Sequence, residues 1–453
     1  MNYTTHSLLS GLMLATLAGC DSDDTSLDEI DRLSPVLLSE EVIEVNEFLE
    51  SVSFTGTTKI LNLNVGVGSG AFHFKDDNSD EFYTITDRGP NIACNESAQV
   101  LDIENFCIDG NGRADKEGKI FPVPSFTPSI YKLDIDAGGV FGTKVGYEVI
   151  ETITLKDRDD NPISGLPNPL QVTTTENAYD KNGNKLDLDP EGVDTEAIVK
   201  LSNGTFWLAE EYGPSLIHVA ANGRILERIV PAGVEADLAN ANYRIIGALP
   251  AILKKRLLNR GIESLAVSPD EDFLYFIMES PLAHQNSRYV RLFKVSLREF
   301  DLDSIVAEYV YVIDEPETFT ADNTTKQTDV KISEMVALDT DKLIILERVT
   351  RHTKLYQLSE LGNATNILGT EWDDEAIEPS LEMLPDLAAQ GIIPLEKKLV
   401  FDSRRDLSDL DSKIEGLALL NDQYLVFIND NDFGVKGVQT RIRLEKRVEQ
   451  LDK

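Results

Sequence analysis

The sequence predicts an all-β protein, a β-propeller of five or six four-stranded blades with short helical insertions. Two observations favour this fold. A unit of two apolar strands joined by a turn recurs along the chain, and each copy begins and ends near an acidic residue. The clearest copies begin at Glu196, Glu263, Glu334 and Glu415, which are 67, 71 and 81 residues apart. Recurrence of a strand-hairpin unit at such intervals is typical of a propeller.

The strands of each unit can be followed in order along the chain. The units span residues 69–87, 196–210, 263–279, 334–347 and 415–430. Turn residues such as Ser202-Asn203-Gly204 separate the two strands of a unit. Further strands follow, such as RYVRLFKVSL and AEYVYVID after Glu279, so each unit has the four strands of a blade. Five units are countable, and a sixth would fit around residues 120–190.

The end of the chain and two internal segments depart from this pattern. The last unit ends in TRIRLEKRVE, one strand short of a blade. We expect the strand near residues 52–63 to pair with it and close the ring, because closure removes an exposed edge. Residues 234–258 and 375–391 have helical spacing between strands. They predict the helical insertions, on one face of the propeller.

The N-terminus predicts export and a lipid anchor. Residues 8–19 are an uncharged apolar run, too short to span a bilayer but suited to a signal peptide. The run leads into Leu17-Ala18-Gly19-Cys20, which resembles a bacterial lipoprotein box, although no Lys or Arg precedes it. We therefore expect a lipoprotein signal peptide at 1–19, an acidic tether at 20–45 and the propeller domain at 46–453. Cys20 would carry the lipid on the periplasmic or cell-surface side of the envelope.

Net charge limits the partners of the chain. The formal charge is −37, so the surface repels nucleic acid and anionic membranes. We expect no nucleic-acid partner, and membrane contact only through the anchor. A small-molecule ester is the expected substrate, and a strongly anionic one would need a cation. Protein partners stay open.

Cys94 and Cys107 lie in one loop rich in Gly, Asn and Asp. In an oxidising compartment the pair predicts a disulfide. Closing a loop of this size would contribute roughly 3 kcal/mol in the chain-entropy model.

Several motifs resemble one protein family. They are DRGPN at 87–91, DPEGVDTEAI at 189–198, AEEYGPS at 209–215, NRGIESLAVSPDEDFLYFIMESPL at 259–282 and KIEGLALLNDQYLVFINDNDFG at 413–434. In this order, over about residues 50–440, they resemble the phytase-like family described as having "esterase-like activity of phytase". The resemblance implies a β-propeller and hydrolysis of a phosphate ester or another ester with a divalent cation.

The recurring acids predict a ring of carboxylates around one mouth of the propeller channel. Hard divalent cations prefer such oxygen ligands, and Ca²⁺ is the expected cofactor. The candidate metal ligands are Asp87, Glu196, Glu210, Glu211, Glu263, Glu279, Glu334, Glu347, Glu415 and Asp430. The alternative is that each acid binds backbone N–H groups or a neighbouring Arg. Without a cation, clustered buried carboxylates would raise one another's pKa.

Three residues are the candidates for catalysis. Arg88 follows one of the acids, and Arg is suited to bidentate phosphate recognition, although salt bridging within the ring is the alternative. His284 follows Glu279 and is the histidine best placed for acid–base chemistry, although a lone loop His is often incidental. Glu263 is the third candidate, for proton transfer.

A separate calcium loop is the last candidate site. Asp180, Asn182, Asn184 and Glu191 occupy positions 1, 3, 5 and 12 of an EF-hand-type loop. Lys185 replaces the expected Gly and no helices flank the segment, so an Asx-rich turn is the alternative.

Other chemistries lack their motifs. The chain has no G-x-S-x-G elbow, no H-E-x-x-H and no Gly-rich phosphate loop. We therefore expect a Ca²⁺-dependent hydrolase of phosphate esters. The alternatives are a non-catalytic propeller that binds a ligand or protein in the cell envelope, and a Ca²⁺-dependent lactonase-type esterase.

Overall fold

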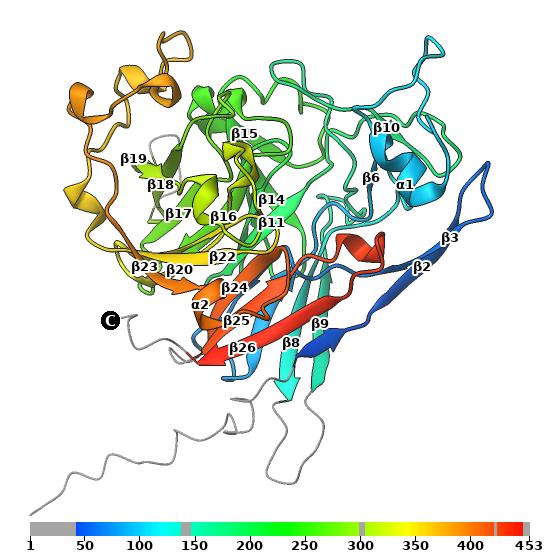
Figure 1. Cartoon of the computed structure of the whole chain (residues 1–453), viewed down its shortest axis with the longest axis horizontal. Helices are drawn as coiled ribbons and strands as arrows, with labels where there is room; N and C mark the ends of the chain where they lie inside the picture. Colours follow the sequence, from blue (N-terminus) through cyan, green and yellow to red (C-terminus); the bar gives the residue numbers. More distant parts are fainter. Residues whose placement is uncertain (1–41, 137–145, 299–303, 421–423, 447–453) are drawn as a thin grey trace, which may run out of the picture.

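Five sheets built alike dominate the computed structural model, which describes residues 42–136, 146–298, 304–420 and 424–446 (Figure 1). The first sheet comprises β4 (Gly70–Phe72), β5 (Glu81–Ile85), β8 (Ser129–Asp136) and β9 (Gly146–Thr154). The second comprises β11 (Thr195–Lys200), β12 (Phe206–Glu210), β13 (Ser215–Val219), β14 (Ile225–Pro231) and β15 (Arg244–Leu249).

The other three sheets have four strands each. The third comprises β16 (Ile262–Val267), β17 (Phe273–Met278), β18 (Tyr289–Ser296) and β19 (Ile305–Val312). The fourth comprises β20 (Lys331–Asp339), β21 (Lys342–Arg348), β22 (Thr353–Leu358) and β23 (Lys397–Asp402). The fifth comprises β24 (Ile414–Leu420), β25 (Tyr424–Asn429), β26 (Thr440–Lys446) and β1 (Ile43–Val45).

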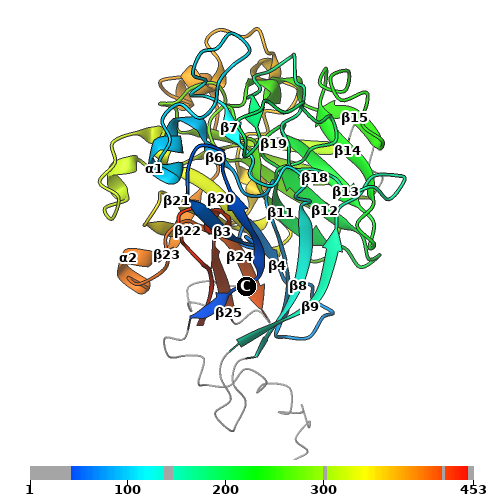
Figure 2. The ribbon, with the colours of Figure 1, turned by 90° about the vertical axis from the view of Figure 1, so that its right-hand side faces the viewer.

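The first strands of these sheets form a closed ring. Strand β4 contacts β11, β11 contacts β16, β16 contacts β20, β20 contacts β24, and β24 returns to β4. The remaining strands of each sheet follow outward, as Figure 2 shows for the green strands β11 to β15. Every residue of β16 is buried, because neighbouring sheets cover both of its faces. This closed arrangement is a β-propeller and confirms the predicted fold class.

Ring closure uses a different strand from the one that the sequence predicted. Strand β1 pairs with β26, with Ile43 opposite Ile442 and Val45 opposite Thr440. It alternates buried, exposed and buried, which suits a strand added at the outer edge of a sheet. Strands β2 (Phe48–Ser53) and β3 (Ile60–Asn64) instead pair with each other, so the expected closure by residues 52–63 was wrong.

The β2–β3 hairpin packs on a small subdomain beside the ring (Figure 1). That subdomain comprises β6 (Ile92–Ala93), η3 (Cys94–Glu96), α1 (Ser97–Leu101), β7 (Lys119–Ile120) and β10 (Ala178–Tyr179). Buried Val52 and Leu63 of the hairpin join its core. The disulfide between Cys94 and Cys107 lies in the same core and confirms the predicted pairing.

Residues 120–190, where a sixth blade would have fitted, supply β8 and β9 to the first sheet and β10 to the small one. No further four-stranded sheet occurs in the described residues.

The predicted helical insertions are short 3-10 turns. Residues 234–258 contain η4 (Ala251–Lys255), but also β15, which joins the second sheet. Residues 375–391 contain η9 (Leu381–Met383) and η10 (Ala388–Gln390). The remaining turns and helices are η5 (Pro316–Thr318), η6 (Gln327–Asp329), η7 (Leu361–Asn363), η8 (Glu371–Asp373), α2 (Ser403–Asp406) and η11 (Asp432–Gly434).

Residues 1–41 lie outside the described part of the chain, and with them the predicted signal peptide and Cys20. Among the residues that the structure describes, no helix is both long and apolar enough to cross a membrane.

Candidate functional site

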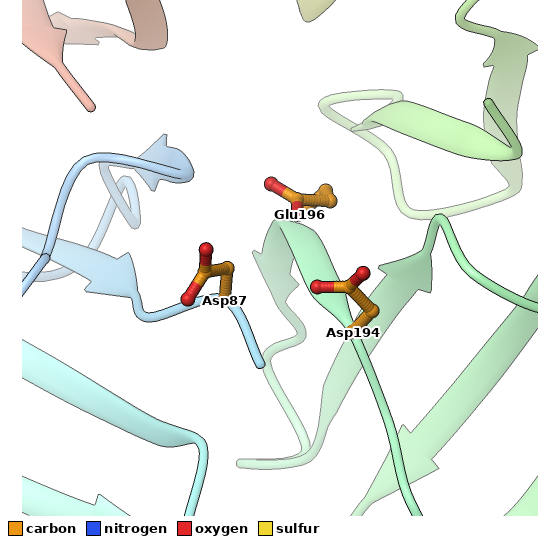
Figure 3. A group of neighbouring side chains, drawn as sticks. All are labelled: Asp87, Asp194 and Glu196. Carbon is orange, nitrogen blue, oxygen red and sulfur yellow. The ribbon is translucent and has the colours of Figure 1, made fainter. Parts of the chain in front are cut away.

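Two groups of three carboxylates lie at one mouth of the propeller. Group 1 contains Asp87, Asp194 and Glu196 (Figure 3), and group 2 contains Glu211, Glu263 and Glu279. Within each group, one oxygen from every residue lies within 4.8 Å of the others. These side chains come from the starts of first strands, from the ends of second strands, or from the residues beside them. The structure therefore brings five of the ten predicted ligands into two clusters.

Irregular pairing at the start of the first strands positions several of these acids. In β11 the register skips Glu196, because Thr195 pairs with Glu210 and Ala197 with Ala209. The same irregularity skips Glu263 in β16 and Glu415 in β24. A bulge of this kind turns the extra residue out of the regular alternation. It thus lets a strand buried on both faces present a carboxylate at the mouth.

The fourth sheet explains why Glu334 behaves differently. There the skipped residue is Ser333, because Ile332 pairs with Glu347 and Glu334 with Leu346. Ser333 is thus the structural counterpart of Glu263, and its hydroxyl donates to the Glu263 carboxylate at 2.9 Å. Glu334 lies one residue further along the strand and outside both groups.

Group 1 is poorly neutralised. The Asp87 carboxylate accepts the Gly89 amide at 2.7 Å, and Asp194 accepts the Arg88 amide at 3.2 Å. Within the described residues, no hydrogen bond or ion pair holds the Glu196 side chain. Burial, then the charge of Asp194, raises the pKa of both Asp87 and Glu196 well above the ordinary value. Asp87 and Glu196 therefore favour the protonated form unless a further cation lies close to them.

The Oδ2 atom of Asp194 is a buried oxygen of group 1 that lacks a hydrogen-bond donor within the described residues. Asp194 is 2% exposed, and its Oδ2 has no hydrogen-bond partner in the described part of the protein. The Arg88 guanidinium lies 3.4 Å from this oxygen and is its nearest counter-charge. A buried, incompletely paired carboxylate oxygen beside two more carboxylates fits a cation site. Oxygen-only ligands suit hard cations such as Ca²⁺ or Mg²⁺.

Group 2 contains its own positive charges. Lys331 forms an ion pair with Glu279, and the Arg260 Nε lies 3.4 Å from the same carboxylate. These cations overcome the effect of burial and hold the pKa of Glu279 at about 2. Burial, then the charge of Glu279, raises the pKa of Glu211 and Glu263 well above the ordinary value. Group 2 therefore combines an ionised carboxylate with two that favour the protonated form.

The other five predicted ligands bind protein groups instead. Glu210 lies against Arg228 at 3.0 Å and accepts the Gly213 amide at 2.8 Å. Glu334 accepts the amides of Ala71 and Met335.

The last three of these acids pair with basic side chains. Glu347 pairs with Lys397 and accepts the Asp314 amide at 2.9 Å. Glu415 pairs with Arg348, and the Asp430 carboxylate lies 2.8 Å from the Lys413 Nζ. For these acids the structure supports the alternative interpretation, binding to backbone amides or basic groups.

Arg88 is buried, and its guanidinium is bound by protein groups. Its guanidinium donates to Glu176 at 2.9 Å and to the Asn259 side chain at 3.0 Å. It also lies 4.7 Å from the centre of the Tyr212 ring and 5.1 Å from that of Phe121. These contacts hold the guanidinium beside group 1, 3.4 Å from Asp194.

His284 lines a separate pocket, described below, whose lining includes none of the ten predicted ligands. It is half-buried and lies in the loop after β17.

The candidate calcium loop forms an Asx-rich turn. Asp180 Oδ1 accepts the amides of Asn182 at 2.8 Å and Asn184 at 2.9 Å. The Glu191 carboxylate accepts the Asn242 amide instead. The Asp180 and Glu191 carboxylates, which a calcium loop would use, thus accept backbone amides.

The sequence interpretation missed Asp194. A signal was available, because Asp194 precedes Glu196 by two residues and alternate residues of an extended segment point to the same side.

Fold and site together define a β-propeller with a cluster of buried carboxylates at one mouth, able to bind a metal ion. The phytase-like family model, described as "Esterase-like activity of phytase", matches residues 68–433, and the chain belongs to this family. This membership supports a propeller of the hydrolase type, with small-molecule esters as substrates.

An uncharacterized secreted protein of Arthroderma benhamiae is 24% identical over 364 residues, covering 63% of this chain and 69% of the relative. Among solved structures, the Malassezia sympodialis allergen Mala s 1 is 10% identical with a TM-score of 0.34, over 92% of this chain and 95% of that one. The periplasmic gluconolactonase PpgL of Pseudomonas aeruginosa is 9% identical with a TM-score of 0.32, over 90% of this chain and 93% of that one. At such scores the fold assignment rests on the sheet topology.

Proposed function

We propose that the protein is a Ca²⁺-dependent hydrolase of phosphate esters. The observation that carries this proposal is the contrast between the two carboxylate groups. Among the described residues, Arg88 is the only direct counter-charge of the three acids of group 1, whereas group 2 adjoins Lys331 and Arg260. A cation is needed where negative charge is least compensated, so we assign the metal to group 1.

In this proposal Asp87, Asp194 and Glu196 hold the cation. When bound, Ca²⁺ would neutralise phosphate charge and make a bound water more acidic. Arg88 keeps Asp194 in place through its amide and guanidinium contacts.

Group 2 would handle the proton and the phosphate oxygens. Glu263 Oε2 is buried and accepts no hydrogen bond within the described residues, so it has the capacity to carry a proton. Its raised pKa favours the protonated form that a leaving alkoxide needs. Arg260 donates to Ser280 at 2.9 Å and its side chain is 22% exposed, so its guanidinium can reach a bound oxyanion.

The test is hydrolysis by the full chain of phosphomonoesters, phosphodiesters, carboxylic esters and lactones, with Ca²⁺ or with a chelator. We expect Ca²⁺-dependent turnover of a phosphate ester. Glu196→Gln should lower this turnover by at least about tenfold. Loss of a residue that only supports a metal ligand already costs roughly tenfold to a hundredfold. Glu347→Gln is the control, because Glu347 is also buried but pairs with Lys397.

The same assay separates the alternatives. Turnover of lactones alone would identify a lactonase-type esterase. No turnover of any ester, with Ca²⁺ still raising the melting temperature, would refute catalysis and favour a binding propeller.

We also propose that the chain is exported and anchored by lipid on Cys20. The apolar run at 8–19 and the Leu17–Cys20 sequence support this, as does the relative named as a secreted protein. Labelled palmitate should be incorporated in a bacterial host and lost in Cys20→Ala. Equal labelling of both chains would contradict the proposal.

A further inference from the structure

A second pocket lies outside the two carboxylate groups and is rich in positive charge. Its volume is about 550 Å³, and its lining includes Lys254, Lys255, Arg256, His284 and Ser380. The basic triplet stands out on a chain whose formal charge is −37. Its lining comes from residues 171–174, from η4 and the residue after it, from the loop after β17 and from the insertion between β22 and β23.

Arg256 is a buried cation without a carboxylate partner. It is 4% exposed and donates to the Tyr212 carbonyl at 2.5 Å, to the Thr174 hydroxyl at 2.9 Å and to the Thr174 carbonyl at 2.9 Å. No Asp or Glu forms an ion pair with it within the described residues. Burial lowers its pKa below the ordinary value, and the more distant charges of Glu210, Glu211 and Glu176 only partly oppose this effect.

The pocket also contains donors that have no acceptor. Ser380 is 4% exposed, and its Oγ lacks a hydrogen-bond partner in the part of the chain that the structure describes. In the same described residues, the side chains of Lys255 and His284 form no hydrogen bond or ion pair. Lys254, by contrast, pairs with Glu375 at 2.9 Å.

Two acids, Glu378 and Glu382, line the pocket against three basic residues. Glu382 is 5% exposed, and its carboxylate accepts from Arg291 at 2.8 Å. Glu378 is exposed to solvent. The pocket therefore keeps an excess of positive charge and unused donors, which is the chemistry that recognises an oxyanion.

We propose that this pocket binds an oxyanion, a phosphate or a carboxylate group, between Lys255, His284 and Ser380 above the buried Arg256. The Tyr212 carbonyl that Arg256 contacts belongs to the residue directly after Glu211 of group 2. An anion in the pocket would thus lie beside the carboxylate mouth. In that place the pocket could hold a second negative group of a molecule bound at the mouth. The proposal does not depend on the hydrolase function.

The test is calorimetric titration of inorganic phosphate, and separately of acetate, into the full chain in chelator and at low ionic strength. The chelator removes any anion binding through a metal at group 1, so failure here is distinguishable from failure of the hydrolase proposal. Lys255→Gln should weaken binding about tenfold, the effect of losing roughly one charge-assisted hydrogen bond. Ser380→Ala should weaken it less.

Lys75→Gln is the matched control, because Lys75 is exposed, lines a different pocket and gives the same change in net charge. The proposal is supported if phosphate alone, or both anions, bind and if Lys255→Gln weakens this binding while Lys75→Gln does not. Equal affinities in the three proteins, or no heat and no change in melting temperature with either anion, would overturn it.

Discussion

Arg291 joins the insertion between β22 and β23 to the third sheet, and its removal should be among the most damaging single changes. The side chain is completely buried. Its guanidinium donates to Glu308 at 2.7 Å, to Glu382 at 2.8 Å and to the Trp372 carbonyl at 3.0 Å. Glu308 belongs to β19, whereas the other two partners lie in the insertion, the gold segment at the upper left of Figure 1.

Arg291→Met keeps most of the side-chain volume but leaves Glu308 and Glu382 buried without their shared cation. Breaking a buried ion pair in this way costs about 3–5 kcal/mol, because the remaining charge has lost both water and partner. We expect the free energy of unfolding to fall by about that amount. Burial already raises the pKa of Glu308 well above the ordinary value even with Arg291 in place.

Urea unfolding followed by tryptophan fluorescence measures this loss, and Trp372 lies in the insertion itself. Arg298→Met is the matched control, because Arg298 pairs with Asp272 on the surface and its side chain is 71% exposed. Surface pairs contribute little, so this variant should unfold close to wild type. A loss in Arg291→Met no larger than that in Arg298→Met would refute the reasoning.

Two further predictions concern backbone packing and pH. Gly165→Ala places a Cβ 1.8 Å from the Arg88 carbonyl oxygen, so we expect clear destabilisation and weaker Ca²⁺ binding at group 1, whereas Gly362→Ala meets open space and should leave the melting temperature unchanged. Equal melting temperatures for the two variants would contradict this. His218 stacks on Trp207 at 4.5 Å, and burial lowers the pKa of its imidazole below 6.5. The stability that neutral His218 contributes is therefore present above that pH and lost as the pH falls through the folded-state pKa. Wild type should lose stability on acidification below about pH 6.5 faster than His218→Phe. If the melting temperatures of the two proteins fall in parallel with pH, this prediction is wrong.

The propeller could be predicted from the sequence because its signal is local. Each hairpin lies within about twenty residues, and turn residues such as Gly204 with φ +84° mark where the chain reverses direction. The disulfide was equally accessible, because both cysteines lie in one loop. Closure of the ring could not be predicted in the same way, because several short alternating segments near the N-terminus could each pair with the edge of the last sheet. The choice of β1 depends on contacts with β26, which lies almost 400 residues away.

The candidate site was only partly predictable, because its charges are matched across sheets. Glu279 and Glu347 occupy similar places in their repeats, yet Glu279 joins group 2 while Glu347 pairs with Lys397 from a later strand. The shift of Glu334 has another cause. The fourth sheet has the same bulge as the others, but Ser333 occupies the bulge position that a Glu occupies in β11, β16 and β24. Spacing along the chain does not encode either effect.

The closure of the ring by β1 also gives the molecule a polarity. Val45 lies opposite Thr440, at the end of the fifth sheet that faces the carboxylate mouth, and Ile43 lies two residues further from it. The chain therefore enters the propeller from the side away from the mouth. A lipid on Cys20, as proposed above, would therefore connect to the domain at the end of the fifth sheet that lies away from the carboxylate groups.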